Sequence, residues 1–375
     1  MRVPNSMLPV FNDLAAVLRG LDQYRAGMPM REIQKNIAYP AIWMWGFAPT
    51  GIGAAQTVAV GVIVCLAATA STVLFLGKLT ISEGIAAAIL LVSPSFMLGV
   101  ERCNVDLVVF LIVISAAWLL GQRAVPLVWP ACLILFAAFL KLYPIAAATA
   151  FIKKQSGWRV LIVCVTCFAT YCFLIKNQIK LIQNQQFRDI FYSFGCMVPF
   201  DRLYFLQQRG VIERRWFELS GLAAALLIAG VAVAFTSRPR VAATLTAGVT
   251  GTGFLAGASI YILVFLMGNH YSYRFRWLIL VVPQLFFWIR EKGAGYRRAL
   301  AALAALLCTV YTTNFGYGEV QSRFAFVLDS FNWILFAALV SLLYSVLLDD
   351  VRSLISKFRA REPASALILE SRASV

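Results

Sequence analysis

Residues 124–152 have the sequence AVPLVWPACLILFAAFLKLYPIAAATAFI. This stretch is long enough and apolar enough to lie in a bilayer, yet it carries one cation, Lys141, with Pro144 within a turn of it. An ammonium at membrane depth is costly, so it persists only where it faces a cavity, a partner or a ligand. The proline also frees backbone carbonyls that another group must satisfy. The stretch therefore predicts a membrane-embedded chain with a broken helix near Lys141–Pro144 that binds a charged group.

The composition of the whole chain agrees with a membrane protein. The chain has 375 residues, of which 61% are hydrophobic and 13% charged. Its mean hydropathy is +0.79. These values predict an all-α, polytopic transmembrane bundle of about 10 spans or half-spans. The net charge of +16 would suggest nucleic acid in a soluble protein, but basic residues in cytoplasmic loops explain it here, and we expect no nucleic-acid partner.

Apolar runs predict where the membrane segments fall. The runs are 50–76, 84–98, 105–120, 124–140, 142–152, 157–176, 218–236, 241–267, 277–289, 298–313 and 327–348. The stretch 124–152 has two interpretations. One continuous helix would place Lys153 on the opposite side of the membrane from Arg123, whereas two half-spans would return the chain to the same side.

The distribution of basic residues favours the broken helix, because cytoplasmic loops are rich in lysine and arginine. With the break, the cytoplasmic loops hold 11 lysines and arginines in 31 residues, and the outer loops hold 10 in 69. The cytoplasmic loops are 77–83, 121–124, 153–159, 237–240 and 290–298. The outer loops are 99–105, 177–216, 268–276 and 314–326. A continuous helix would instead place the basic loop 290–298 outside.

This topology divides the chain into three parts. Residues 1–49 form an extracytoplasmic loop, residues 50–348 the transmembrane domain, and residues 349–375 a cytoplasmic tail. The longest outer loop, 177–216, is typical of interfacial helices. Because no apolar run precedes the first loop to carry it across, we expect the native chain to have an earlier helix upstream of Met1. Unaided translocation of the N-terminus is the alternative.

The sequence indicates no metal site or cofactor. Cys164, Cys167 and Cys172 begin like a CxxC motif, but they lie in an apolar span with no histidine or acidic ligand nearby. We interpret them as small side chains that face lipid or other helices. His270 is the one histidine of the chain, and no Walker loop, GxGxxG or HExxH motif occurs.

Polar residues gather beside the spans on the predicted outer face. The groups are Asn12-Asp13, Tyr39-Pro40 with Trp43, Glu101-Arg102-Cys103-Asn104-Val105-Asp106, and the run from Gly268 to Arg276. By the broken-helix count, Lys141 lies near the same level. The convergence on one surface predicts a functional site there.

Five strings together resemble the bacterial membrane proteins around glycosyltransferase family 87, of the GT-C superfamily. They are Tyr39-Pro40-Ala41-Ile42-Trp43, Ser93-Pro94, Glu101-Arg102-Cys103-Asn104-Val105-Asp106, Leu140-Lys141-Leu142-Tyr143-Pro144 and Asn269-His270-Tyr271-Ser272-Tyr273-Arg274. The resemblance covers roughly residues 10–290. It implies a GT-C-like fold. The chain departs from the family in beginning at the first outer loop, without a preceding helix, and in having Cys103 where we expect glycine.

The resemblance implies a glycosyltransferase of the bacterial inner membrane with its active site on the extracytoplasmic face. Such an enzyme moves a hexose or pentose from a polyprenyl-phosphate donor to a lipid-linked or envelope glycan acceptor, among membrane lipids and without a cofactor. Asp13 matches the acid that acts as general base on the acceptor hydroxyl. Attack opposite the leaving group would invert the anomeric centre.

The leaving polyprenyl phosphate is anionic, so the reaction needs cations rather than an acid. The candidates are Lys141, Arg102, Arg274 and His270. The residues expected to bind substrate or shape the site are Tyr39, Trp43, Glu101, Asn104, Asp106, Tyr143, Asn269 and Tyr273.

Structural roles are open for the same residues. Asp13 suits the N-cap of a helix that starts at Leu14. Lys141 suits an ion pair with Asp106. Arg276 suits a snorkelling side chain at a span end, better than its neighbour Arg274 does.

Further structural alternatives concern the loops. Glu101, Arg102 and Asp106 suit a salt-bridge cluster that closes a helix hairpin. His270 suits a hydrogen-bonded loop residue, and the aromatic side chains suit an interfacial belt as well as a sugar platform.

Two other classes of function compete with an enzyme. A secondary transporter also uses broken helices and buried charges. We find no internal repeat of interrupted helices, however, and the polar groups gather on one face rather than at mid-depth. The third class is a non-catalytic membrane assembly protein with the same fold.

Overall fold

The computed structural model describes residues 10–34, 37, 39–185, 193–201, 214–236, 243–268, 270–312 and 319–359. Almost all regular structure in these ranges is helical, as predicted. The exception is a two-residue antiparallel pairing of β1 (Ser193–Phe194) with β2 (His270–Tyr271), which joins two loops far apart in the sequence. Residues 360–375 of the predicted tail 349–375, the predicted loop 237–240, and parts of the predicted loops 177–216 and 314–326 lie outside the described residues.

Five helical segments are long and apolar enough to cross a membrane. The apolar segments are Ala54–Leu76, Gly157–Leu174, Trp216–Thr236, Val249–Leu266 and Asp329–Leu348. In the same order, the helices that contain them are α4 (Thr57–Leu76, with its preceding turn), α9 (Gly157–Leu174), α12 (Arg214–Thr236), α13 (Val249–Leu266) and α16 (Glu319–Arg359). A sixth is the pair α5 (Ile81–Leu91) and α6 (Pro94–Glu101), bent by 53°. The chain therefore has the character of a polytopic helical membrane protein.

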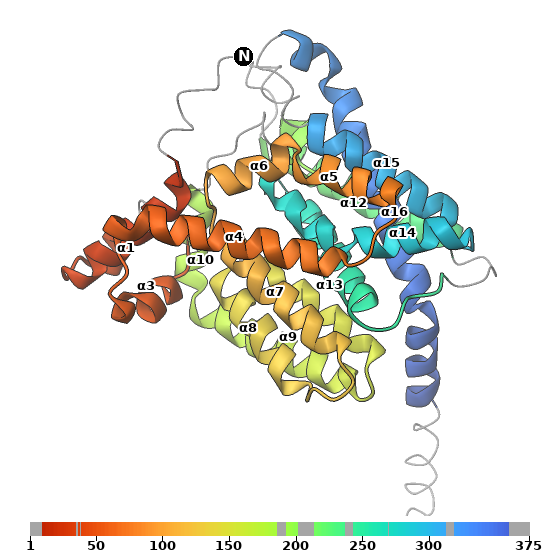
Figure 1. Ribbon diagram of the computed structural model, residues 1–375, viewed down its shortest axis with the longest axis horizontal. Helices are drawn as coiled ribbons and strands as arrows, with labels where there is room; N and C mark the ends of the chain where they lie inside the picture. The colour runs from red at the N-terminus through yellow and green to blue at the C-terminus, as the bar shows by residue number, and fades with distance from the viewer. Residues whose placement is uncertain are drawn as a thin grey trace, which may run out of the picture.

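The other predicted segments are shorter than full spans. Two are apolar helices, α7 (Asp106–Gly121) and α8 (Val128–Leu140). Two more are α14 (Val282–Glu291) and α15 (Tyr296–Thr312). Figure 1 shows α7, α8 and α9 side by side on one side of α4, with α5, α6 and α15 on the other.

Helix α13 lies at the centre of the bundle. In its apolar window 72% of the residues are buried, against 11% for α9 and for α12, whose faces are free to meet lipid. It packs against two 3-10 segments, η4 (Tyr143–Lys153) and η5 (Ser272–Leu280). Gly257 permits this close approach, because a Cβ atom there would lie 2.6 Å from the carbonyl oxygen of Trp277. On the η4 side, the hydroxyls of Thr149 and Ser259 are 2.7 Å apart.

The predicted break at Lys141 is confirmed. Helix α8 ends at Leu140, Lys141 has an extended backbone (φ −150°, ψ 126°), and η4 follows from Tyr143. The carbonyls left at the break are satisfied, since Leu140 O accepts from Trp43 Nε1 at 3.0 Å and Phe139 O accepts from the Tyr171 hydroxyl at 2.9 Å. The cost expected for freed carbonyls in an apolar environment is thereby avoided.

The two ends of the segment 124–152 lie close together, as two half-spans require. Burial, then the charge of Arg123, lower the pKa of Lys154, so the two residues at the ends of this segment are close enough to interact electrostatically. A continuous helix of this length would hold them about 40 Å apart. Likewise, Arg290 Nη1 lies 3.5 Å from the carboxylate of Glu83, so the loops 77–83 and 290–298 meet. Each pair of loops thus lies together in the fold, and their location on the cytoplasmic side stays a prediction.

The N-terminal residues form short helices beside the start of α4. They are α1 (Asn12–Arg25), α2 (Met30–Gln34), α3 (Ile42–Phe47), η2 (Ala48–Thr50) and η3 (Ala54–Gln56). Figure 1 shows α1 and α3 at one end of α4. The domain boundary predicted at residue 49 thus falls inside a continuous series of short helices.

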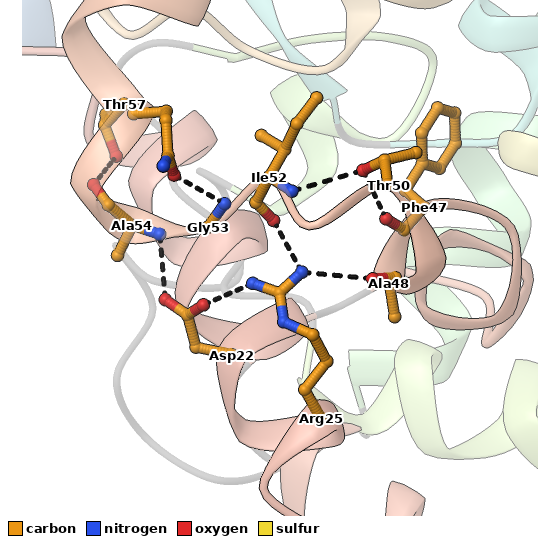
Figure 2. A network of polar contacts seen from close by, with 10 residues as sticks. Asp22, Arg25, Phe47, Ala48, Thr50, Ile52, Gly53, Ala54 and Thr57 are labelled. Atoms are coloured by element: carbon orange, nitrogen blue, oxygen red, sulfur yellow. Dashed lines mark hydrogen bonds and ion pairs between the residues drawn. The ribbon is translucent and has the colours of Figure 1, made fainter.

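A polar clasp fixes the end of α1 to the start of α4 (Figure 2). Arg25 Nη1 donates to the carbonyls of Ala48 (3.1 Å) and Ile52 (2.9 Å). Arg25 Nη2 contacts Asp22 Oδ1 at 2.5 Å, and Asp22 Oδ2 accepts from Ala54 N at 2.8 Å. The Ala54 N–H, then Arg25, lower the pKa of Asp22, so its carboxylate is ionised at neutral pH. Gly53 leaves room for the clasp, because a Cβ atom there would lie 2.1 Å from Asp22 Oδ1 and would displace that side chain.

Candidate functional site

Asp13 lies in the first turn of α1 and is bound by two residues from the segment after α6. Arg102 donates to Asp13 Oδ1 from Nε at 3.0 Å and from Nη2 at 2.6 Å. Asn104 Nδ2 donates to Asp13 Oδ2. The Asp13 side chain is 14% exposed. Its carboxylate is therefore oriented by both neighbours and still reachable from outside.

The interpretation of Asp13 as an N-cap is wrong. Helix α1 begins at Asn12, its capping residue is Phe11 in the left-handed conformation (φ 61°), and no side chain caps it. Instead the backbone docks on the segment after α6: Phe11 N donates to Glu101 O at 2.9 Å, and Asp13 N donates to Arg102 O at 3.2 Å. The start of α1 is thus fixed by contacts distant in sequence.

Asn104 links this carboxylate to a second one. Asn104 Oδ1 accepts from the backbone N of Asp106 at 2.9 Å and from Lys141 Nζ at 3.4 Å. Lys141 Nζ also forms an ion pair with Asp106 Oδ1. Asp106 is the first residue of α7, where the helix dipole favours a negative charge. The alternative that Lys141 pairs with Asp106 is therefore confirmed, and both side chains are buried.

Arg274 brings a second cation to the same carboxylate. Arg274 Nε lies 3.5 Å from Asp106 Oδ2, and its guanidinium lies 5.1 Å from the centre of the Tyr143 ring. Arg274 Nη1 also contacts His270 Nδ1. Because the guanidinium can only donate, His270 Nδ1 accepts and its proton is on Nε2.

His270 is neutral in this environment. Burial, then the charges of Arg274 and Lys141, lower its pKa well below the ordinary value. Its Nε2 atom is buried and has no hydrogen-bond partner among the described residues. An N–H in that position is an unmet donor, and buried polar groups are normally paired. It can donate to a ligand.

Aromatic rings cover the cations. Lys141 Nζ lies 5.1 Å from the centre of the Tyr39 ring, and Tyr39 and Trp43 have ring centres 6.2 Å apart. Trp43 is 4% exposed, which contradicts the interpretation of this residue as part of an interfacial belt. The rings of Tyr143 and Trp277 pack edge to face, with their centres 5.8 Å apart. Cation–π contacts of this kind help to hold charged groups away from water.

The structure thus brings most of the predicted site residues into one cluster. The connected members are Asp13, Arg102, Asn104, Asp106, Lys141, Arg274 and His270, with Tyr39 and Tyr143 against the cations. Glu101 contributes its backbone carbonyl to α1. The ring of Tyr273 stacks on the ring of Tyr271, with the ring centres 5.6 Å apart. Tyr273 is the second residue of η5. Asn269 lies outside the described residues.

Arg276 is a residue that the sequence interpretation missed. The prediction that Arg276 snorkels at a span end is wrong, because only 5% of its surface is exposed. Its Nη2 atom donates to the Phe96 carbonyl oxygen at 3.5 Å. Its Nη1 atom has no hydrogen-bond partner among the described residues. The available signal was an arginine placed between Phe275 and Trp277 at the start of an apolar run.

The chain matches no protein-family profile, no curated protein and no solved structure. Among the described residues no cluster of three histidine, cysteine or acidic side chains is placed to hold a metal ion.

Proposed function

We propose that this protein is a membrane glycosyltransferase that moves a hexose or pentose from a polyprenyl-phosphate donor to a lipid-linked or envelope glycan acceptor. In this proposal the site opens on the extracytoplasmic face of a bacterial inner membrane. The motifs that resemble glycosyltransferase family 87 suggest the reaction. The geometry of the cluster supports it through two features, an excess of buried positive charge and a carboxylate positioned beside it.

The charge of the cluster is the observation that carries the proposal. Arg102 is balanced by Asp13, but Lys141 and Arg274 share the single carboxylate of Asp106, and His270 is neutral. One positive charge is therefore left over in a buried setting, before Arg276 is counted. Uncompensated buried charge is costly, so an anion that binds here gains from neutralising it. A phosphate with an apolar polyprenyl tail has both the charge and the membrane solubility required.

Asp13 is the proposed general base. Its two oxygens accept hydrogen bonds from Arg102 and Asn104, which fix the direction of the carboxylate. Each carboxylate oxygen can accept more than one hydrogen bond, so an acceptor hydroxyl has room to donate as well. Deprotonation of that hydroxyl as it attacks the anomeric carbon, opposite the phosphate held by Lys141 and Arg274, gives inversion.

The proposal is tested with the reconstituted full chain and polyprenyl phosphate as the probe. Direct binding is measured by native mass spectrometry, and transfer is measured with radiolabelled polyprenyl-phosphate hexoses and pentoses in membranes that supply acceptors. We expect saturable binding of polyprenyl phosphate and, with one of the donors, label in lipid or glycan. Polyprenyl alcohol, which lacks the phosphate, is the control ligand. If polyprenyl phosphate binds no more tightly than polyprenyl alcohol, the phosphate site is overturned. Binding without transfer of any donor would favour the non-catalytic assembly protein.

A further inference from the structure

Cys103 occupies an unusual backbone position inside the candidate site. It lies between Arg102 and Asn104, the two residues that hold Asp13, and its φ of 39° is in the left-handed region. Cys103 is buried, with 1% of its surface exposed. The strained turn allows its two neighbours to face the same carboxylate, while the Cys103 side chain points the other way, into α4.

The Cys103 side chain and Cys65 of α4 make reciprocal contacts. Cys103 Sγ lies 3.8 Å from Gly61 O, the carbonyl one helical turn before Cys65. Cys65 Sγ lies 3.5 Å from Val100 O, which also accepts from Cys103 N at 3.0 Å. Each thiol therefore lies against the backbone segment that carries the other thiol, which places the two side chains next to each other. They are present as free thiols in the structure.

We propose that Cys65 and Cys103 form a disulfide in the mature protein, which joins the membrane helix α4 to the segment that holds Asp13. The inference does not depend on glycosyl transfer. It depends on the reciprocal contacts of the two thiols and on the predicted outer location of this end of α4, because disulfides persist in the oxidising compartment outside the cytoplasm. Cys65 lies in the half of α4 nearer to Thr57, the end that adjoins the N-terminal helices.

The oxidant is a protein of the cell envelope that carries a reactive disulfide. Cys65 is half-buried and Cys103 is fully buried, so Cys65 is the thiol that reacts first. Its thiolate attacks one sulfur of the oxidant, forms a mixed disulfide and releases the other sulfur as a thiolate. The thiolate of Cys103 then attacks the Cys65 sulfur and releases the second thiol of the oxidant. The two cysteines lose two electrons and two protons, and the oxidant becomes a dithiol.

The neighbouring charges suit first attack by Cys65 rather than by Cys103. Arg276 lies near both thiols, whereas the carboxylate of Asp13 lies near Cys103 and opposes its ionisation. A guanidinium beside a thiol stabilises the thiolate, which is the reactive form. Cys164, by contrast, has no such cation beside it among the described residues. Its ionisable neighbours there are two other thiols, Cys132 and Cys167.

The test counts free thiols on the full chain produced in a bacterium with an oxidising envelope. Cells are quenched in acid, and the protein is denatured and alkylated before its mass is measured. Of the eight cysteines we expect six to be alkylated. In Cys65→Ser and in Cys103→Ser all seven remaining thiols should react, because the partner is released. Since the count is made on denatured protein, it holds even where a variant folds poorly.

Cys164→Ser is the matched control, because it also removes a buried thiol that has cysteine neighbours. It should still lack two labels, which leaves five alkylated thiols of seven. Alkylation of all eight cysteines in the unaltered chain would overturn the proposal. So would two missing labels that persist in Cys65→Ser, since the disulfide would then lie elsewhere.

Discussion

Lys141 forms an ion pair with Asp106, so the residue that follows the last turn of α8 is tied to the residue that begins α7. The pair joins two interruptions in the helical backbone. Arg274 reaches the other oxygen of the same carboxylate from η5. Three segments that enter the bundle separately therefore meet at Asp106, and the excess cation at this point is the basis of the proposed phosphate site.

The general base can be tested by a change that preserves size. Asp13→Asn removes the negative charge and keeps a side chain that can hydrogen-bond. We expect sugar transfer to fall by ~10²–10⁴-fold, the usual contribution of a general base, while binding of polyprenyl phosphate is retained. Asp22→Asn is the matched control, since Asp22 lies on the same helix and also pairs with an arginine. Wild-type transfer by Asp13→Asn would move the base to another carboxylate.

The phosphate contact can be tested at Lys141. Lys141→Met leaves Asp106 with Arg274 as a partner, so we expect the variant to fold. Its affinity for polyprenyl phosphate should fall by about 1.5–3 kcal/mol, the worth of a charge-assisted hydrogen bond, and Lys141→Arg should recover part of the loss. Affinity equal to that of the unaltered chain would show that Lys141 serves Asp106 alone.

The double variant separates stability from binding. Lys141→Met with Arg274→Met removes both partners of the buried Asp106 carboxylate, which should destabilise the protein by about 3–5 kcal/mol. Adding Asp106→Leu should restore folding, because no charge then remains unpaired. Thermal unfolding in detergent measures both effects. An unchanged unfolding temperature in the double variant would mean that Asp106 has another partner.

The clasp between α1 and α4 can be tested at Gly53. A Cβ atom there lies 2.1 Å from Asp22 Oδ1 and 2.7 Å from Arg25 Nη2, so Gly53→Ala should displace both side chains. We expect a loss of about 0.5–1.5 kcal/mol in the free energy of unfolding, because the clasp is exposed and water can replace its contacts. Gly46→Ala is the control, because a Cβ atom on that glycine has nothing within 4 Å. Equal stability of the two variants would contradict the clasp.

The topology can be tested by labelling single cysteines in a cysteine-free chain. The exposed positions 156 and 294 should be protected from a membrane-impermeant maleimide in intact cells, because their loops are predicted to be cytoplasmic. The exposed positions 26, at the end of α1, and 267, just before the strand of His270, should be labelled because they lie in or next to predicted outer segments. Labelling of 156 together with protection of 267 would reverse the orientation.

The break at Lys141 and the convergence of the charged motifs could be predicted from the sequence. A lysine beside a proline in an apolar run is a local signal with few explanations in a membrane. The start of α1 could not be predicted in the same way, since Phe11 takes up its left-handed conformation where its backbone bonds to Glu101. That contact depends on the tertiary structure, and a local capping preference pointed to Asp13 instead.

The burial of Arg276 was missed for a related reason. A sequence shows an arginine near the end of an apolar run, and snorkelling is the usual expectation. Here η5 packs tightly on α13 through Gly257, and this packing draws Arg276 inside. The sequence predicted about 10 spans or half-spans without saying which are full crossings, because apolar composition does not distinguish a full crossing from a shorter apolar helix such as α7 or α8.

The bond between Asp13 and Arg102 has a consequence for how the protein is made. The partners are separated by 89 positions, so α1 leaves the ribosome long before Arg102 does. At ordinary rates of synthesis of about 5–20 residues per second, the interval is roughly 4–18 seconds. During that time the helix has a carboxylate without its counterion and an apolar face without its cover. The contacts that fix the start of α1 can therefore form only after the segment that carries Arg102 has been synthesised.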